Sequence, residues 1–408
     1  MPSYDIIIIG GGLIGSSVAY HLSKTGSKNI ALLDIDLEGK YSSSELNAGG
    51  IRTLWWHDVN VELSKATISF LETDPQNFGF RQKGYLWLHD AKSWKTYQDH
   101  QGIFQKHQIS IEELAVEDLK NRAPFLDKTD DLVGATYSAK DGIFNPNLLK
   151  QYFRSEAKKQ GVSLIDGARV VDIGKKEKGL EIIYENLCVE QKKPNLEDVF
   201  GILAKAQEPH FQEKIKIKTD VLVNAAGAWA KNISRLYGHK IDCYPVRRQV
   251  SIFDCQGLDL SGQGMIVDSS GVYFHAEAKH ILAGYATPNE PSGYNFKYDG
   301  DLFFEKEIWP RLYQRMTRAE ALKHLTGWAG LYSVTPDRSG VMGCVDPKYK
   351  IYEAHSFTGR GAMQSYGVGL ALSELITFRK YQSIDASALH PKRFHSAHGK
   401  LLYEGMHI

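Results

Sequence analysis

A run of glycines near the N-terminus has the spacing of a turn that binds the phosphates of a dinucleotide. Residues 10–15, GGGLIG, satisfy the pattern G-x-G-x-x-G. They follow an apolar run short enough for a buried strand and begin a segment with helical spacing of apolar residues. Backbone N–H groups and the helix dipole at such a helix start favour a pyrophosphate. The pattern predicts a pyrophosphate site, or alternatively a glycine turn that binds nothing. The residues concerned are Gly10, Gly12, Leu13, Ile14 and Gly15.

Two acidic residues are candidates for binding the ribose of such a ligand. Asp34 ends the next apolar run, at about the 20-residue distance that the motif requires. Asp36 is a weaker alternative because it lies beyond the end of that run. The turn and the acid together predict an adenosine diphosphate site. They do not separate NAD from FAD, since both cofactors contain that group.

Three later segments favour FAD. Residues 41–52, YSSSELNAGGIR, supply hydroxyls at Ser43 and Ser44 and adjacent glycines at Gly49 and Gly50, along which an extended cofactor could pass. Residues 221–229, VLVNAAGAW, predict a buried strand ending in small residues, which let a ligand approach the backbone. Residues 355–376 place two glycines before a helix whose dipole would stabilise negative charge on a reduced flavin. Each segment alone could be a turn or a packing helix, but an NAD-dependent dehydrogenase would explain only the first 40 residues.

The order of apolar runs predicts an α/β protein, α+β overall, with two domains. Residues 4–34 have the pattern of a strand, a glycine turn, a helix and a strand, and further parallel-type pieces follow at 147–173, 179–185 and 220–225. Short alternating strands rich in aromatic residues predict a mainly antiparallel second sheet. We expect a cofactor domain from residues 1–83, 143–234 and 335–408, and a substrate domain inserted in two pieces, 84–142 and 235–334. Residues 186–218 are interpreted as a surface excursion of the cofactor domain.

Composition excludes several classes of protein. The 49 basic residues nearly cancel the 48 acidic ones, so nothing indicates a nucleic-acid partner. The four cysteines are far apart without C-x-x-C spacing, which argues against a metal site or disulfides and for a reducing compartment. No run approaches the ~20 apolar residues of a transmembrane segment, and no signal peptide is evident. We therefore expect a cytoplasmic protein.

The chain resembles the D-amino-acid oxidase-like FAD-dependent oxidoreductases, a family that includes glycine oxidase, sarcosine oxidases and dimethylglycine dehydrogenase. The matching stretches are NAGGI, VNAAGAW, YPVRRQV, DSSGVYF, GWAGLY and TGRG followed by GVG. It most resembles the branch called FAD-dependent oxidoreductase domain-containing protein. The excursion at 186–218 also resembles an insertion in that branch. The resemblance implies a glutathione-reductase-type FAD-binding Rossmann-like domain beside the antiparallel substrate domain.

The resemblance also implies roles for individual residues. The glycine turn, Asp34, Ser43, Ser44, Gly49 and Gly50 would bind along FAD, with Arg52 near the flavin. Val171 would meet the adenine through its backbone. The strand end would contribute Ala226, Gly227 and Trp229, and the flavin-ring loop would contribute Gly359, Gly361, Ala362 and Met363.

Departures from monomeric sarcosine oxidase carry further predictions. Gly330 stands at the position of the cysteine that tethers the flavin, so we expect noncovalent FAD, and Cys344 lies too far along the chain to replace it. Met363 and Trp55 stand where a lysine and an arginine hold the substrate carboxylate, which argues against a plain sarcosine oxidase. Leu282 replaces the lysine that promotes reaction with oxygen, and Lys279 is expected to face the opposite side of the strand.

The candidate substrate residues are Arg52, Tyr273, Tyr332 and Arg360, because a guanidinium can hold a carboxylate and aromatic rings can enclose an amine. The arginines could instead hold a flavin carbonyl or an internal carboxylate, and the tyrosines could be core residues. His275 is a candidate acid or base, although an isolated histidine is more often structural.

The predicted reaction is hydride transfer from the carbon next to a secondary, N-methyl or D-amino-acid amine to flavin N5, giving an imine. We expect the electrons to pass to a quinone or an electron-transfer protein, and only slowly to oxygen. The alternative is a flavin-containing interaction protein that assists assembly of a respiratory complex with little amine turnover.

Overall fold

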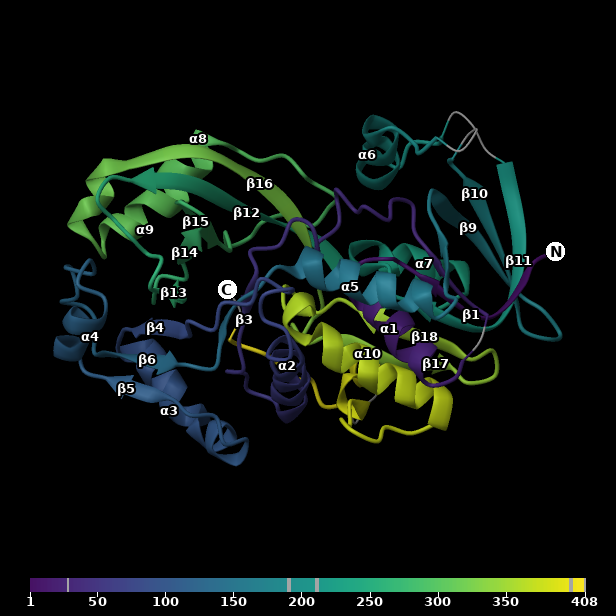
Figure 1. Cartoon of the computed structure of the whole chain (residues 1–408), viewed down its shortest axis with the longest axis horizontal. Helices are drawn as coiled ribbons and strands as arrows, with labels where there is room; N and C mark the ends of the chain where they lie inside the picture. The colour runs from purple at the N-terminus through teal and green to yellow at the C-terminus, as the bar shows by residue number, and fades with distance from the viewer. Residues whose placement is uncertain (28, 189–191, 210–212, 396–398, 407–408) are drawn as a thin grey trace.

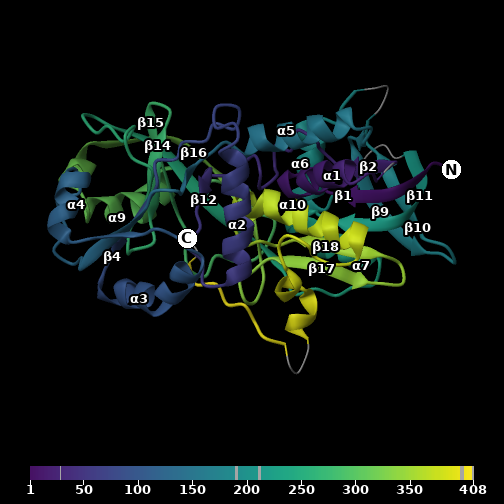
Figure 2. The same ribbon diagram turned by 60° about the horizontal axis from the view of Figure 1, so that its bottom comes forward.

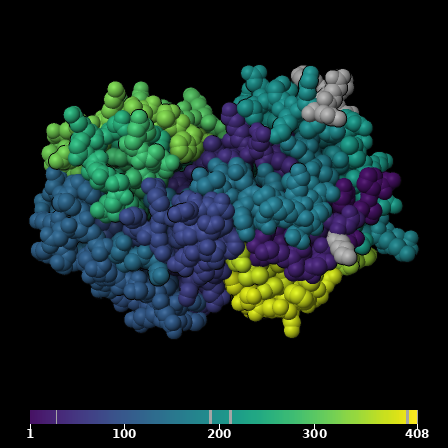
Figure 3. Space-filling view, viewed as in Figure 1, coloured from purple at the N-terminus to yellow at the C-terminus, as the bar shows by residue number. Residues whose placement is uncertain are grey.

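The protein contains two large β-sheets in two lobes. The computed structural model describes residues 1–27, 29–188, 192–209, 213–395 and 399–406, which form two eight-stranded sheets and one two-stranded sheet. Figure 3 shows the lobes: one contains the blue and green segments, and the other contains most of the purple, teal and yellow segments. The predicted fold class, a parallel-sheet cofactor lobe beside a mainly antiparallel lobe, is confirmed, whereas the exact domain boundaries stay a prediction.

The first sheet has the order β17-β18-β11-β1-β2-β8, with β10 paired to β11 and β9 to β10. β1 pairs in parallel with β2 and β11, so the run Ile6–Ile9 lies inside the sheet and is buried, which explains its uninterrupted apolar sequence. The carboxyl ends of the parallel strands meet at one edge, where such sheets bind ligands. The strands are β1 (Ser3–Ile9), β2 (Ile30–Leu33), β8 (Ser163–Ile165), β9 (Ala168–Lys175), β10 (Leu180–Asn186), β11 (Glu213–Asn224), β17 (Val341–Asp346) and β18 (Ile351–His355).

Helices cover this sheet. α1 packs against α5 and α10, and α10 also packs against α2 (Figure 2). α1 and α10 approach so closely that a Cβ at Gly369 would lie 2.1 Å from Ser17 Oγ. The helices of this lobe are α1 (Leu13–Lys24), α2 (Asp58–Leu71), α5 (Pro146–Lys159), α6 (Leu196–Lys205), α7 (Ala230–Leu236) and α10 (Gly361–Phe378), with short turns η1 (Gly227–Trp229), η4 (Ser387–Leu389) and η5 (Pro391–Phe394).

Two strands differ from the sequence expectation. The single strand expected to end the run 147–173 is two strands, β8 and β9, because the chain turns at Gly167, whose φ is +68°. β11 begins at Glu213, earlier than the expected 220, because it also pairs antiparallel with β10. Its first part alternates lysines with Ile215 and Ile217, and such alternation suits a half-buried strand. The end of the expected excursion is therefore part of the sheet, while its residues 189–191 and 210–212 lie outside the described residues.

The second sheet has the order β16-β12-β15-β14-β13-β4-β6-β5. Its neighbouring strands are antiparallel except β4 and β13, which are parallel and join the two sequence segments that build this lobe. The strands are β4 (Tyr85–His89), β5 (Glu112–Leu114), β6 (Gly134–Ser138), β12 (Tyr244–Cys255), β13 (Met265–Val267), β14 (Tyr273–Glu277), β15 (His280–Tyr285) and β16 (Leu322–Val334). Figure 1 shows β12 and β16 reaching from this lobe toward the first sheet.

Helices of different lengths accompany the second sheet, and a third sheet has two strands. The sequence pattern over 84–142 did not predict the helices of that segment. They are α3 (Ala91–Lys106) and α4 (Val116–Arg122), and the later helices are α8 (Asp301–Phe303), η2 (Phe304–Ile308), α9 (Trp309–Tyr313) and η3 (Thr317–Ala321). The small sheet pairs β3 (Gly50–Ile51) with β7 (Gly142–Ile143). No helix among the described residues has the length and apolar character that a membrane span requires.

Candidate functional site

One long cavity of about 660 Å³ is lined by residues of both large sheets. It extends from the glycine turn to the aromatic residues of the second sheet, and it brings together most of the residues predicted from the sequence. Those that line it are Gly10, Gly12, Leu13, Ile14, Asp34, Ser43, Ser44, Gly50, Arg52, Val171, Ala226, Gly227, Trp229, Tyr273, Tyr332, Gly359, Arg360, Gly361, Ala362 and Met363.

The glycine turn needs its glycines for two different reasons. Gly10 has a φ of +105°, and a Cβ there would lie 2.4 Å from the carbonyl oxygen of Ala225. Gly15 is not part of the lining, but a Cβ there would lie 1.8 Å from the Gly10 carbonyl oxygen, so it permits α1 to start close to β1. The Leu13 N–H donates to Ser44 Oγ over 2.9 Å, which ties the serine loop to the helix start. Gly49, with a φ of +75°, likewise shapes that loop without lining the cavity.

Asp34 follows the end of β2, and its carboxylate accepts hydrogen bonds from nearby backbone N–H groups. Its carboxylate accepts from the N–H of Gly11 and from the N–H of Asp36. Burial raises the pKa of Asp34, while these hydrogen bonds and the nearby Arg154 act in the opposite direction. Asp36 lines the same cavity, so both predicted ribose acids lie beside it.

Two basic residues of α5 that the sequence reasoning missed hold the loops around this end. Lys150 Nζ forms an ion pair with Glu45 and donates to the Glu38 carbonyl oxygen. Arg154 donates to the carbonyl oxygens of Leu37 and Gly11. Their spacing of four residues on one helix face is the signal that could have indicated a shared role.

The segment before α10 has a strained backbone at the cavity wall. Ser356 and Thr358 have φ values of +58° and +47°, a region that residues other than glycine rarely adopt, and both line the cavity. Ser333 holds them, because Ser356 Oγ lies 2.7 Å from Ser333 Oγ and the Thr358 N–H donates to the Ser333 carbonyl oxygen. A Cβ at Gly359 would lie 2.4 Å from the ring of Tyr332. The N-terminus of α10 has no side-chain cap, so its first N–H groups remain available to a ligand.

Two buried arginines meet beside Trp55 at the opposite end from Asp34. The Arg52 guanidinium lies 3.9 Å from the Trp55 ring centroid, and that of Arg360 lies 4.9 Å from it. Arg52 and Arg360 are 2% and 1% exposed, and within the described ranges neither has a carboxylate at ion-pair distance. Nε of Arg52 and both Nε and Nη2 of Arg360 find no hydrogen-bond partner there. Burial lowers the pKa of Arg52 to about 10.

Tyrosines and a third arginine also line the cavity near Arg52 and Arg360. Tyr273 and Tyr332 line the cavity, and burial raises the pKa of both phenols. Tyr85 and Arg248 line it too, and the sequence reasoning did not single them out for the site. A Cβ at Gly50 would lie 2.0 Å from the Tyr85 hydroxyl, which accounts for the second of the adjacent glycines. Arg248 lies 5.3 Å from the Tyr332 ring centroid.

His275 and Leu282 are placed differently from the sequence expectation. His275 is fully buried behind the cavity wall, and its ring nitrogens lie 2.9 Å from the Ala276 carbonyl oxygen and 3.0 Å from that of Ala48. Burial lowers its pKa. His275 is not among the lining residues, and these contacts fit the structural role that is the alternative to an acid or base. Leu282 pairs with His275 on the neighbouring strand and packs in an apolar cluster with Tyr273. Like His275, Leu282 is not part of the lining. Lys279 is exposed.

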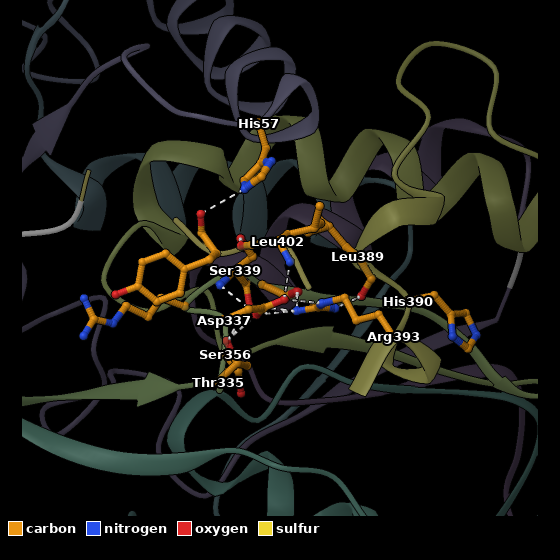
Figure 4. Close-up of polar contacts among 12 residues, drawn as sticks. His57, Thr335, Asp337, Ser339, Ser356, Leu389, His390, Arg393 and Leu402 are labelled. Atoms are coloured by element: carbon orange, nitrogen blue, oxygen red, sulfur yellow. Dashed lines mark hydrogen bonds and ion pairs between the residues drawn. The ribbon is translucent and has the colours of Figure 1, made fainter. Parts of the chain in front are cut away.

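The C-terminal segment, residues 402–406, contacts Arg52 from outside the cavity lining, and nothing in the sequence pattern indicated it. The Met406 carbonyl oxygen accepts from Arg52, and the Glu404 carboxylate accepts from the Trp56 N–H and from Asn60 Nδ2. Figure 4 shows what anchors this segment: Asp337 is paired with Arg393 and accepts from the Leu402 N–H over 2.9 Å. In Figure 2 the yellow end of the chain returns to the middle of the molecule.

These residues fit FAD. The glycines leave room where Cβ atoms would collide. The N-termini of α1 and α10 lie at two points along the cavity. The cavity continues from the ribose acids to the aromatic end. Among the described residues that line it there is no cysteine. A mixed sheet with a parallel centre and a glycine turn, sharing such a cavity with a mainly antiparallel sheet, is the architecture of a flavin-dependent oxidoreductase.

Comparison with known proteins identifies the family. The family model described as FAD dependent oxidoreductase matches residues 5–375, and the chain belongs to this family, with FAD as its cofactor. It is 27% identical to FAD-dependent oxidoreductase domain-containing protein 1 of Xenopus laevis, over 96% of this chain and 83% of that protein. It is 23% identical to the mitochondrial sarcosine dehydrogenase of Mus musculus, over 96% of this chain and 41% of that protein. The resemblance inferred from the motifs is confirmed.

Solved structures share the fold over nearly the whole chain. L-proline dehydrogenase from P. horikoshii superposes with a TM-score of 0.81 at 24% identity, covering 97% of this chain and 99% of the other. Glycine oxidase from Geobacillus kaustophilus gives a TM-score of 0.76 at 19% identity, covering 96% and 99%. At these identities the likeness establishes the fold alone.

Proposed function

We propose that this protein oxidises a secondary amine, N-methyl amino acid or D-amino acid that carries a carboxylate, producing an imine. The observation that carries the proposal is the pair of buried guanidiniums of Arg52 and Arg360 without a carboxylate partner among the described residues. A buried guanidinium that lines a ligand cavity and has no carboxylate at ion-pair distance can still pair with a ligand that brings the opposite charge. Names of relatives and of proteins with this fold, which include sarcosine dehydrogenase and L-proline dehydrogenase, support an amino-acid substrate.

Bound FAD supplies the hydride acceptor, and the protein supplies binding, orientation and electrostatics. An arginine of the pair would hold the substrate carboxylate, while the rings of Tyr85, Tyr273 and Tyr332 would enclose the amine. The phenols stay neutral because burial raises their pKa, so they can position the amine by hydrogen bonds.

The amine must lose its proton before it can lose a hydride, and the arginines favour that loss. Like charges nearby destabilise an ammonium in a medium of low dielectric constant. Arg52, Arg248 and Arg360 all line the cavity, so the neutral amine is favoured there without a dedicated base. His275, buried outside the cavity lining, is not needed for this proton loss.

The absence of a lining cysteine among the described residues supports noncovalent FAD, as does the glycine at position 330, which lines the cavity. No lysine belongs to the described lining either, which supports a dehydrogenase that passes electrons to a quinone or an electron-transfer protein more readily than to oxygen. A fixed ammonium beside the reduced ring is the group that would promote reaction with oxygen.

A second candidate is a flavin-containing interaction protein with little amine turnover, assisting assembly of a respiratory complex. The observation in its favour is that the Met406 carbonyl oxygen and the Leu54 carbonyl oxygen already accept from Arg52. Met363 and Trp55, in place of the expected substrate-holding cations, point in the same direction.

Anaerobic mixing with a panel of amines separates the two candidates. The panel contains D- and L-amino acids, secondary and N-methyl amino acids, and the same amines without their carboxylate. The proposal expects bleaching of the flavin absorbance near 450 nm, on the order of seconds or faster, by some carboxylate-bearing amines and by none of their decarboxylated partners. A panel without bleaching, on protein that retains FAD, supports the interaction protein. Bleaching by the decarboxylated amines alone contradicts the role of the arginine pair.

A further inference from the structure

The connection between β10 and β11 is far longer than the fold requires. Antiparallel neighbours can be joined by about two to five residues, whereas this connection runs from 187 to 212 and contains the helix α6. In Figure 1, α6 stands at the upper edge of the molecule, separate from the helices α1, α2 and α10 that cover the first sheet. A long insertion with its own helix calls for a reason other than chain reversal.

One face of α6 belongs to the cofactor cavity. Ile202 and Leu203 line it, together with Ala206 and Glu208 just beyond the helix end. The lining beside them includes residues 169–171 of β9, the strand that contains the predicted adenine contact Val171. The segment therefore lies at the adenosine end, and the inner face of this surface excursion contributes to the cavity lining.

The other residues of α6 follow the amphipathic pattern of a helix that covers a surface. Val199 is buried and Phe200 is half-buried on the inner side, whereas Leu196, Glu197 and Asp198 are exposed. Asn195 caps the helix by accepting from the Asp198 N–H over 2.8 Å. The helix thus has its own start signal and presents its apolar side to the cavity.

Aromatic rings from separate parts of the chain hold α6 in this position. We call Tyr41, Phe200, Trp229 and Phe296 the aromatic latch. The Phe200 ring centroid lies 5.4 Å from that of Tyr41 and 6.2 Å from that of Phe296, which in turn stacks on Trp229. Trp229 Nε1 also donates to the Leu203 carbonyl oxygen over 3.0 Å.

The latch joins α6 to both lobes and to the cavity itself. Tyr41 and Trp229 line the cavity, and Phe296 lies on the loop between β15 and α8 of the second lobe. That loop is fixed by Arg247, which pairs with Glu290 and Asp299. The ion pair between Arg169 and Glu208 contributes little, because the glutamate side chain is largely exposed. Apolar packing therefore dominates the attachment of α6.

We propose that the segment 192–209, held by the aromatic latch, is a cover for the adenosine half of FAD, so that retention of the cofactor depends on α6. The cover adds apolar contact and excludes water where a Rossmann-type site would otherwise be open. It distinguishes FAD from FMN, because FMN has the flavin and one phosphate but no adenosine to cover. The proposal does not depend on which amine, if any, is oxidised.

The test measures cofactor binding in the holoprotein and its variants. Dissociation of FAD on dilution is followed by the rise in flavin fluorescence, and protein freed of cofactor is then titrated with FAD and with FMN. Phe200→Ala opens the latch and Ile202→Ala removes a lining side chain. Leu196→Ala, on the exposed side of the same helix, is the matched control. Thermal unfolding of each variant without cofactor monitors folding.

Phe200→Ala and Ile202→Ala are each expected to raise the Kd for FAD by about tenfold, the effect of losing roughly one buried apolar side chain. The Kd for FMN should change less than about twofold, and Leu196→Ala should behave as the unmodified protein. Unchanged FAD dissociation in both inner variants overturns the proposal. Equal weakening of FAD and FMN also overturns it, because it indicates a general loss of the fold rather than of a cover for adenosine.

Discussion

Replacing Arg52 by methionine tests whether the buried arginine pair serves the substrate or the fold. Lowering the pKa of the guanidinium from 12.5 to about 10 corresponds to a cost of roughly 3 kcal/mol for its charged form. Against this stand two hydrogen bonds to the carbonyl oxygens of Leu54 and Met406, worth about 1 kcal/mol each, and the stacking on Trp55, worth about 1 kcal/mol. These contributions cancel to within about 1 kcal/mol, so Arg52→Met should leave the free energy of unfolding nearly unchanged.

The effect on catalysis should be large. A guanidinium that pairs with a substrate carboxylate in a buried site contributes about 2–5 kcal/mol, because its loss leaves the carboxylate unpaired. We therefore expect the rate constant of flavin reduction divided by the substrate Kd to fall by at least about 30-fold. Arg169→Met is the matched control, since Arg169 lines the adenosine end of the same cavity and is paired with Glu185 and Glu208.

Anaerobic stopped-flow spectroscopy and urea unfolding of the FAD-loaded proteins give the two quantities separately. Arg52→Met should slow flavin reduction and leave the free energy of unfolding unchanged. Arg169→Met should leave flavin reduction unchanged. The reasoning is refuted if Arg52→Met loses more than about 3 kcal/mol of stability while FAD-loaded molecules are reduced at the normal rate. That result would make Arg52 a structural residue that fixes the C-terminal segment.

Four further predictions concern the cofactor, oxygen and pH. Asp34→Ala should weaken FAD binding by ~1–3 kcal/mol in a titration, because charge-assisted bonds to ribose are lost; a loss confined to Asp36→Ala would assign that role to Asp36. Acid precipitation should leave the yellow colour in the supernatant, since Gly330 offers no tether, and a yellow pellet would contradict noncovalent binding. Photoreduced protein mixed with air-saturated buffer should be reoxidised at least ~100-fold more slowly than a good flavin oxidase, because no lysine is found in the described lining. Burial raises the pKa of Asp141 from 3.8 to about 7, so the folded chain binds this proton more tightly than the unfolded chain. The stability that this proton contributes is complete below a pH of about 3.8 and is lost as the pH rises through about 7. Asp141→Asn should therefore flatten the dependence of Tm on pH between about pH 4 and 8. An unchanged profile would show that Asp141 is ionised throughout this range.

Local patterns carried the predicted residues that the structure places at the cavity. The turn at Gly10–Gly15 and the acid Asp34 belong to one strand-turn-helix-strand unit, so their spacing in the sequence fixes their spacing in the fold. The strand end at Ala226 is of the same kind, because a buried parallel strand must deliver its last residues to the ligand edge of the sheet.

Depth along a strand was the point where sequence reasoning failed. Tyr273 and His275 are two residues apart on β14 and so share one face of the strand, but a period of two residues identifies the face and not the distance from the cavity. Tyr273 reaches the lining, whereas His275 lies one step further and is covered by the Ala48 carbonyl oxygen. Leu282 lies on the neighbouring strand, where it pairs with His275, and it too lies outside the cavity lining.

The residues missed altogether depend on contacts between distant segments. Tyr85 and Arg248 come from different strands that meet only when the second sheet assembles, and the C-terminal segment reaches the site through the buried pair of Asp337 with Arg393. None of these contacts has a characteristic local spacing. A single sequence therefore gives no signal for them, even where each residue type would suit a ligand site.

Two segments that neither sheet requires lie near the two ends of the cavity: α6 contributes to the lining, and residues 402–406 contact Arg52 from outside it. α6 lies in a connection that a short turn could replace, and residues 402–406 follow the last helix that covers the first sheet. L-proline dehydrogenase has the same fold over nearly the whole chain, so the fold itself does not determine which ligand is held. If α6 governs the adenosine half and the C-terminal segment positions Arg52, then cofactor retention and substrate choice are set by two independent additions. Variants in one should leave the other property unchanged, since α6 lines the adenosine end of the cavity and residues 402–406 contact Arg52 at the other end.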